Sequence, residues 1–187
     1  LAFGTETVQS FFNAGNADQP FQPNPSRILE HGCLAPATLA KEDGAVFWVS
    51  DDKRICLTRG GGREVISIRA IEEHLASETI LGGFVYSDRG GQFYAVRVKD
   101  KPTLCYNMTT RLWSEASTGV DHGPWVATVA CTANGSQYFG TSTGKICTSR
   151  PDVFDDDGAV MVADVTSQPL VQDGRLFTIS QLHLSLR

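Results

Sequence analysis

Apolar and polar residues alternate along most of this chain, and one pattern occurs three times. In each copy an aromatic-rich strand runs through a turn into a second strand centred on Ile-Cys or Leu-Cys, over residues 45–57, 92–106 and 137–148. The cysteines of these hairpins, Cys56, Cys105 and Cys147, lie 49 and 42 residues apart. That spacing is near the roughly 40–50-residue period of a propeller blade. We therefore expect an all-β fold, a propeller-like stack of small antiparallel sheets in which the three hairpins are equivalent.

The rest of the pattern predicts shorter strands and one helix. Residues 70–77 have helical spacing, with Ile68, Ile71 and Leu75 along one side and Ser67 as the expected cap. Residues 13–25, rich in Asn, Gly and Pro, are expected to form a loop. Further strands are expected at 1–12, 32–39, 64–68, 84–87, 112–115, 125–132, 160–165 and 177–186, the last with a bulge at Gln181. The expected organisation is one β-propeller-like domain over residues 1–187, with one short inserted helix.

Composition and charge narrow the classes of partner. The chain has 187 residues, 41% of them apolar and 20% charged, the balance of a folded globular protein. No apolar run approaches the roughly 18 residues of a membrane span. The net charge of −5 is unlike a groove binder of DNA, which carries a basic face. Arg97, Lys99 and Lys101 are interpreted as the solvent-facing side of one strand, so neither sequence-specific nucleic-acid binding nor membrane association is expected.

The cysteines and the start of the chain bear on the cellular compartment of the protein and on whether the chain is part of a longer one. Five cysteines, with Cys33 and Cys131 besides the three above, form no CxxC pair. We expect them to be mostly buried, reduced thiols in a cytoplasmic protein. The chain opens within a strand pattern and has no initiator Met, which favours a fragment of a longer protein.

Two groups of residues are candidates for chemistry. His31 and Cys33 are two residues apart, so an extended strand would place them on one face as a base beside a nucleophile. Nothing that flanks them resembles a cysteine-hydrolase motif, and catalysis is not expected. Asp155, Asp156 and Asp157 carry oxygen ligands for a hard cation, but their spacing differs from calcium loops and favours a solvated turn.

Glycine pairs and aromatic residues allow two further interpretations. A phosphate loop lies between a strand and the N-terminus of a helix, and of the runs at 60–62, 82–83 and 90–91 only the first has a helix nearby, beyond an intervening strand. We therefore interpret all three as turns. Four aromatic residues are candidates for a carbohydrate platform: Trp113, Trp125, Tyr106 and Tyr138. Packing in the core or between blades is the favoured role for aromatic side chains at strand positions.

Several segments, taken in order, resemble the packaged-DNA stabilisation proteins of short-tailed bacteriophages, which are tail accessory factors below the portal. The resembling segments are FGTETVQSFFNAG, PFQP, ILEHGCLAPATLAKEDGAVFWVS, REVISIRAIEEHLAS, GGFVYSDRGGQFYAVRV, CYNMTTRLWSEAS and FDDDGAVMVADVTSQPL. These segments keep the order of the family, and the resemblance spans roughly residues 3–186. One departure is the segment at 58–63, TRGGGR, which is richer in glycine than a turn of this family.

The resemblance implies a fold similar to a β-propeller and a structural role in the virion tail. Members of the family are longer, so the chain looks like their C-terminal portion. The implied partners are the portal protein and other tail proteins, in a homo-oligomeric ring assembled in the host cytoplasm. The resemblance assigns no catalytic, cofactor-binding or metal-binding residues to this chain. The alternative from another class is a ligand-binding or glycan-processing propeller; a eukaryotic-type interaction propeller lacks its Gly-His and Trp-Asp motifs here.

Overall fold

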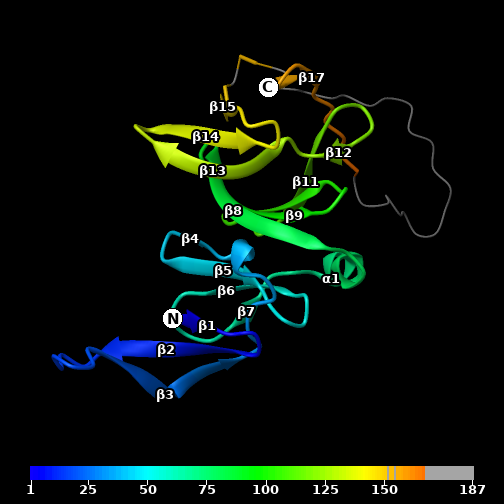
Figure 1. The fold of residues 1–187 in the computed structure, drawn as a ribbon. Coiled ribbons are helices and arrows are strands. Elements are labelled where there is room, and N and C mark those ends of the chain that lie inside the picture. The colour runs from blue at the N-terminus through cyan, green and yellow to red at the C-terminus, as the bar shows by residue number, and fades with distance from the viewer. Residues whose placement is uncertain (151, 154, 167–187) are drawn as a thin grey trace.

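The computed structural model describes residues 1–150, 152–153 and 155–166. Its strands form four successive antiparallel sheets that follow one another through the molecule in chain order (Figure 1). The first sheet contains β1 (Ala2–Phe3), β2 (Thr7–Asn13) and β3 (Phe21–Glu30). The second contains β4 (Ala40–Glu42), β5 (Ala45–Val49), β6 (Ile55–Thr58) and β7 (Glu64–Val65). The expected stack of small antiparallel sheets is confirmed.

The second half of the chain continues this arrangement. The third sheet contains β8 (Ile80–Asp88), β9 (Gly91–Val98), β10 (Thr103–Asn107), β11 (Trp113–Thr118) and β12 (Gly123–Pro124). The fourth contains β13 (Ala127–Ala133), β14 (Ser136–Thr141) and β15 (Ile146–Thr148), and a small hairpin pairs β16 (Asp155–Asp156) with β17 (Ala159–Val160). Helix α1 (Arg69–Ala76) lies between the second and third sheets in the chain, as expected. Ile71 and Leu75 are buried, as their spacing predicts. The N-cap residue is the exposed Ile68, with no side-chain capping bond, so the expectation that Ser67 caps the helix was wrong.

The same kind of tight turn occurs at the start of the second, third and fourth sheets. Each joins the first strand of its sheet to the second through two residues with positive φ: Asp43-Gly44, Arg89-Gly90 and Asn134-Gly135. Positive φ at both central residues is the geometry of a type I′ turn, whose twist matches that of the strands it joins. The glycines of these turns, Gly44, Gly90 and Gly135, are 46 and 45 residues apart. They repeat more regularly than the cysteines do.

A large aromatic residue follows each of these glycines by four positions. Trp48, Tyr94 and Phe139 are all buried and lie on the second strands of their sheets. Each packs against the preceding sheet: Trp48 on Val8, Tyr94 on Phe47 and Phe139 among residues of the third sheet. The aromatic side chain on the second strand is thus the repeating contact between successive sheets.

The predicted equivalence of the three thiols holds for two of them. Cys56 is paired across the sheet with Trp48, and Cys147 with Phe139. In the third sheet, however, the partner of Tyr94 is Tyr106. Cys105 precedes the paired residue Tyr106 by one position. Its side chain packs toward the fourth sheet, with Ala127 and Phe139.

The reason is the length of the second hairpin. The separation between the turn glycine and the cysteine is the same, and even, in the second and fourth sheets, from Gly44 to Cys56 and from Gly135 to Cys147. In the third sheet, from Gly90 to Cys105, it is longer and odd. Successive side chains of a strand point to opposite faces, so an odd difference in spacing turns Cys105 to the other face. All three cysteines still lie on the third strand of their sheets.

The main core lies between the second and third sheets. Phe47 stacks on Tyr94 with ring centroids 5.0 Å apart, and the Tyr94 hydroxyl donates a hydrogen bond of 2.7 Å to the backbone oxygen of Thr38. Burial raises the pKa of Tyr94 far above its ordinary value, so the phenol stays a donor. A side chain at Gly83 would lie 2.9 Å from the Tyr94 hydroxyl, which explains why the pair Gly82-Gly83, expected in a turn, lies inside β8.

Three expected elements differ in the structure. Residues 13–25 are only partly loop, because β3 begins at Phe21; as an edge strand it tolerates Pro23, which has no amide to donate. The expected strand at 32–39 is instead one bridge at Cys33 and a 3-10 turn at Pro36–Thr38. Within 160–165 only Val160 is in a strand. The strand expected at 177–186, with its bulge at Gln181, lies outside the described residues.

Candidate functional site

His31 and Cys33 do not form a catalytic pair. His31 has a φ of 72°, so the backbone there is not extended and the two side chains do not share a face. The imidazole Nδ1 lies 3.1 Å from Asp51 Oδ1, whereas the buried Cys33 thiol donates to the Ala35 carbonyl at 3.2 Å. The spacing argument for a base beside a nucleophile was therefore wrong.

A polar cluster around Arg63, defined here as Ser50, Asp52, Cys56 and Arg63, fills the space next to His31. The guanidinium Nη2 donates to both Asp52 oxygens at 2.8 Å and to Ser50 Oγ at 3.0 Å, and Nε donates to Cys56 Sγ at 3.0 Å. Ser50 also donates to Asp52. Burial raises the pKa of the Cys56 thiol, and the hydrogen bonds from Ser50 and Arg63 offset only part of that effect. The thiol is therefore a packed, protonated group and not an activated nucleophile.

The same region contains the one set of possible cation ligands in the part of the chain that the structure describes. His31, Asp51 and Asp52 bring ligand atoms within 4.8 Å of one another. Sequence reasoning missed this set because the two aspartates are remote from His31 in the chain and meet it only through the fold. The guanidinium of Arg63 already neutralises Asp52, so the arrangement is an ion-pair network that ties the β5–β6 turn to Arg63.

Asp52→Asn should lower the free energy of unfolding by about 1.5–3 kcal/mol at pH 7, since Arg63 would lose its charged partner. Burial alone would raise the pKa of Asp52, but hydrogen bonds from Ser50 and Arg63 and the charge of Arg63 bring it below its ordinary value. A lowered pKa stabilises the fold above the unfolded value near 4, and this stabilisation is lost as the pH falls through the folded value. Urea titrations should show that the difference in free energy of unfolding between the wild-type protein and the variant is smaller at pH 3 than at pH 7. Asp18→Asn, at an exposed site, is the control, and an equal difference at both pH values would contradict this role.

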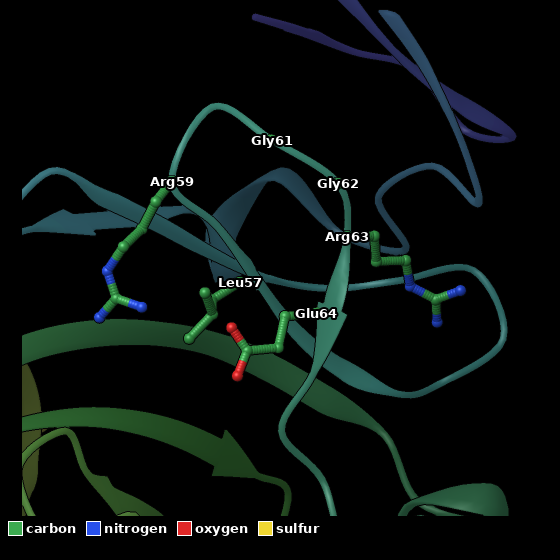
Figure 2. Close-up of a pocket in the computed structure, with 6 residues that line it drawn as sticks. All are labelled: Leu57, Arg59, Gly61, Gly62, Arg63 and Glu64. Atoms are coloured by element: carbon green, nitrogen blue, oxygen red, sulfur yellow. The ribbon is translucent and has the colours of Figure 1, made fainter.

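The glycine run at 60–62 borders a shallow hollow of about 300 Å³ beside β6 and β7. Figure 2 shows Arg63 pointing away from Leu57, Arg59 and Glu64, so the two arginines do not converge. Leu57 and Glu64 are cross-strand partners. The run is a strand-to-strand turn, and α1 begins only at Arg69, so the hollow lacks the helix N-terminus of a phosphate loop.

The three aspartates of the acidic loop have separate partners. Asp155 accepts from the Gly158 amide at 2.8 Å, Asp156 accepts from Thr118 Oγ1 at 3.1 Å, and Asp157 lies 2.8 Å from Lys145 Nζ. Asp157 and Gly158 both have positive φ and form the turn between β16 and β17. Of the three aspartates expected in a solvated turn, Asp155 and Asp156 lie instead on β16, and only Asp157 lies in the turn. Among the described residues, their carboxylates do not form one group of possible cation ligands.

The aromatic residues proposed for a carbohydrate platform belong to separate clusters. Trp113 packs on Tyr106 at 5.1 Å and donates from Nε1 to the Ile66 carbonyl at 2.9 Å. Trp125 packs on Phe139 at 5.4 Å, in another contact between sheets. Tyr138, next to Phe139 along β14, points to the opposite face. The favoured packing role is confirmed for the two tryptophans, since Trp113 packs against the main core and Trp125 packs between the third and fourth sheets.

The basic stretch is not one strand face. Arg97 lies on β9, which ends at Val98, and Lys99 and Lys101 follow in the turn to β10. Lys101 Nζ approaches Glu78 at 3.9 Å. The three cations therefore do not form a continuous row.

Of the five cysteines, all free, Cys33, Cys56 and Cys105 are buried. Burial raises the pKa of the Cys105 thiol to about 11. Cys131 is exposed and Cys147 half-buried. In the described part of the chain, no helix has both the length and the apolar character to cross a membrane.

Comparison with known proteins connects this architecture to a family. A family model named Phage_stabilise and described as bacteriophage P22 Gp10, beta-propeller, matches residues 1–149. The matched range holds β1 to β15, and so all four stacked sheets. No curated protein matches the chain. The chain belongs to the phage structural family described as bacteriophage P22 Gp10, beta-propeller.

Proposed function

We propose that this protein is a component of a phage or prophage tail that attaches below the portal ring, helps to close the channel and so stabilises packaged DNA, without catalysing a reaction. The observation that carries the proposal is the family match over residues 1–149. In this proposal residues 1–187 act as one propeller-like domain. Copies of the protein assemble in the host cytoplasm into a ring that joins the virion.

The fold supports a mechanical role. Large side chains such as Trp48 and Tyr94 are fully buried between sheets, and close-packed interiors of this kind resist deformation. The exposed turns between strands are then free to vary and to contact partners. Such a scaffold withstands load from a packed genome better than a mobile one.

The charge indicates how DNA would be retained. At a net charge of −5, the protein repels the phosphate backbone more than it attracts it. Retention therefore comes from steric closure of the channel and from contacts between proteins. Binding of duplex DNA by the isolated chain at physiological salt is not part of this function.

The test combines assembly with DNA retention. The full chain is mixed with purified portal rings, and the complex is detected by native mass spectrometry. DNA-filled particles that lack the protein are then incubated with it, and nuclease-resistant DNA is measured. We expect a portal complex with several copies of the chain and an increase in protected DNA. Absence of a portal complex, or hydrolysis of a glycan panel by the chain, would contradict the proposal.

A further inference from the structure

A second cavity, of about 320 Å³, lies between the third and fourth sheets and is bounded by the β16–β17 hairpin. Its apolar wall includes Trp125, Phe139 and Ala116. Trp125 and Phe139 belong to an aromatic cluster with Phe84 and Tyr86, whose ring centroids lie 5.4–6.0 Å from that of Trp125 or Phe139. This wall of the cavity is therefore held in place by packing between aromatic side chains.

The rim of this cavity carries an excess of negative charge. Five of its lining residues are carboxylates, Asp88, Glu115, Asp155, Asp156 and Asp157, and two are arginines, Arg89 and Arg150. Arg150 is paired with Asp152 at 2.7 Å and Asp157 with Lys145 at 2.8 Å. Among the described residues, the other four carboxylates of the rim have no cationic partner within salt-bridge distance.

Asp156 is the carboxylate best placed to receive a charge. It is half-buried, and Thr118 Oγ1 donates to its Oδ2 at 3.1 Å. Burial raises the pKa of Asp156; the bond from Thr118 lowers it, and the neighbouring charge of Asp155 raises it. A cation in the pocket would offset that cost, because an opposite charge nearby favours the ionised carboxylate that burial has partly stripped of water.

We propose that this cavity binds an arginine side chain of a partner protein, with the guanidinium stacked on Trp125 and paired with Asp156. An aromatic wall beside carboxylates that have no cationic partner among the described residues suits a planar cation with an apolar stem. Guanidinium both stacks on aromatic faces and forms two parallel hydrogen bonds with a carboxylate. The lysine ammonium is a compact, strongly hydrated point charge and fits this combination less well. The inference rests on the cavity and its charges and stands apart from the proposed position below the portal.

The test uses the full chain and three capped peptides, acetyl-Gly-Xaa-Gly-amide, in which Xaa is arginine, lysine or citrulline. Citrulline keeps the size and planarity of arginine without its charge. Binding is followed by ¹⁵N–¹H NMR through the indole signal of Trp125, assigned with Trp125→Phe. We expect the arginine peptide to shift this signal saturably, the lysine peptide to bind more weakly, and citrulline not to bind. Equal binding of arginine and citrulline, or no binding of arginine, would overturn the proposal.

Variants of the protein distinguish binding in the cavity from a general effect of charge. Trp125→Leu should weaken arginine binding by roughly 2- to 30-fold, the range of a cation–π contact, read from backbone amide shifts of β14. Asp156→Asn keeps the shape of the side chain and an acceptor for Thr118, and should weaken binding about tenfold or more. Asp18→Asn removes a charge in the loop between β2 and β3 and should leave binding unchanged. If Asp156→Asn and Asp18→Asn behave alike, the arginine is not held by this carboxylate.

Discussion

Trp48→Ala should lower the free energy of unfolding by about 3–5 kcal/mol, the usual range for truncating a fully buried tryptophan. The side chain is 0% exposed and packs between the first and second sheets, with its ring 5.4 Å from that of Phe3. Its Nε1 donates to the Gly32 carbonyl at 3.1 Å. The substitution both opens a cavity and leaves that buried carbonyl without its partner. Urea denaturation followed by far-ultraviolet circular dichroism measures the loss.

Ile146→Ala is the matched control for this truncation. Ile146 also lies on a strand of the stack but is 79% exposed, so its removal should change the free energy of unfolding by less than about 0.5 kcal/mol. If Trp48→Ala does not fold, Trp48→Phe preserves part of the packing and still loses the hydrogen bond. A Trp48 variant as stable as Ile146→Ala would show that the first two sheets are not joined through this residue.

Gly32→Ala should destabilise the protein by about 1–3 kcal/mol, the range for overpacking a closed site. A Cβ at Gly32 would lie 2.5 Å from the Glu6 amide nitrogen and closer still to backbone atoms of Gly4 and Thr5. These atoms belong to the turn between β1 and β2, which cannot move away freely because the Cys33 amide donates to the Gly4 carbonyl at 2.7 Å. Hydrogen exchange should show the amides of β2 losing protection while those of α1 keep theirs.

Gly61→Ala is the control for glycine replacement. A Cβ at Gly61 would meet no atom within 4 Å, and the residue is not in the left-handed region. The substitution should be neutral or stabilise the protein by about 0.4–1 kcal/mol, because alanine restricts the unfolded chain. Equal losses at Gly32 and Gly61 would contradict the close approach of Gly32 to the turn between β1 and β2.

The strands could be predicted wherever alternation and turn residues agree. The hairpin expected at residues 45–57 is formed by β5 and β6, which together span residues 45–58, and α1 was expected one residue later than it begins. Prediction failed where a proline-rich stretch lies at a sheet edge, as in β3, and where a positive φ interrupts extension, as at His31. In both places the tertiary context overrides the local preference.

The candidate site was less predictable than the fold. His31 was noticed for its spacing to Cys33, yet its nearest charged neighbour is Asp51, which lies in the turn between β5 and β6. The turn glycines Gly44, Gly90 and Gly135 were a better signal of the repeat than the cysteines, because the turn geometry requires positive φ, whereas a buried thiol only fills space. Their spacing is visible in the sequence, and the aromatic residue four positions later identifies the face that packs.

By itself, the sequence determined that this is a chain of antiparallel hairpins, since side-chain alternation and turn chemistry act between near neighbours. Only the tertiary structure decided which face of each hairpin meets the next sheet, and which charges meet around Arg63 and Asp156. The greater length of one hairpin reverses the face of Cys105 while leaving its strand in place. Those outcomes depend on contacts between residues far apart in the chain, which local pattern does not encode.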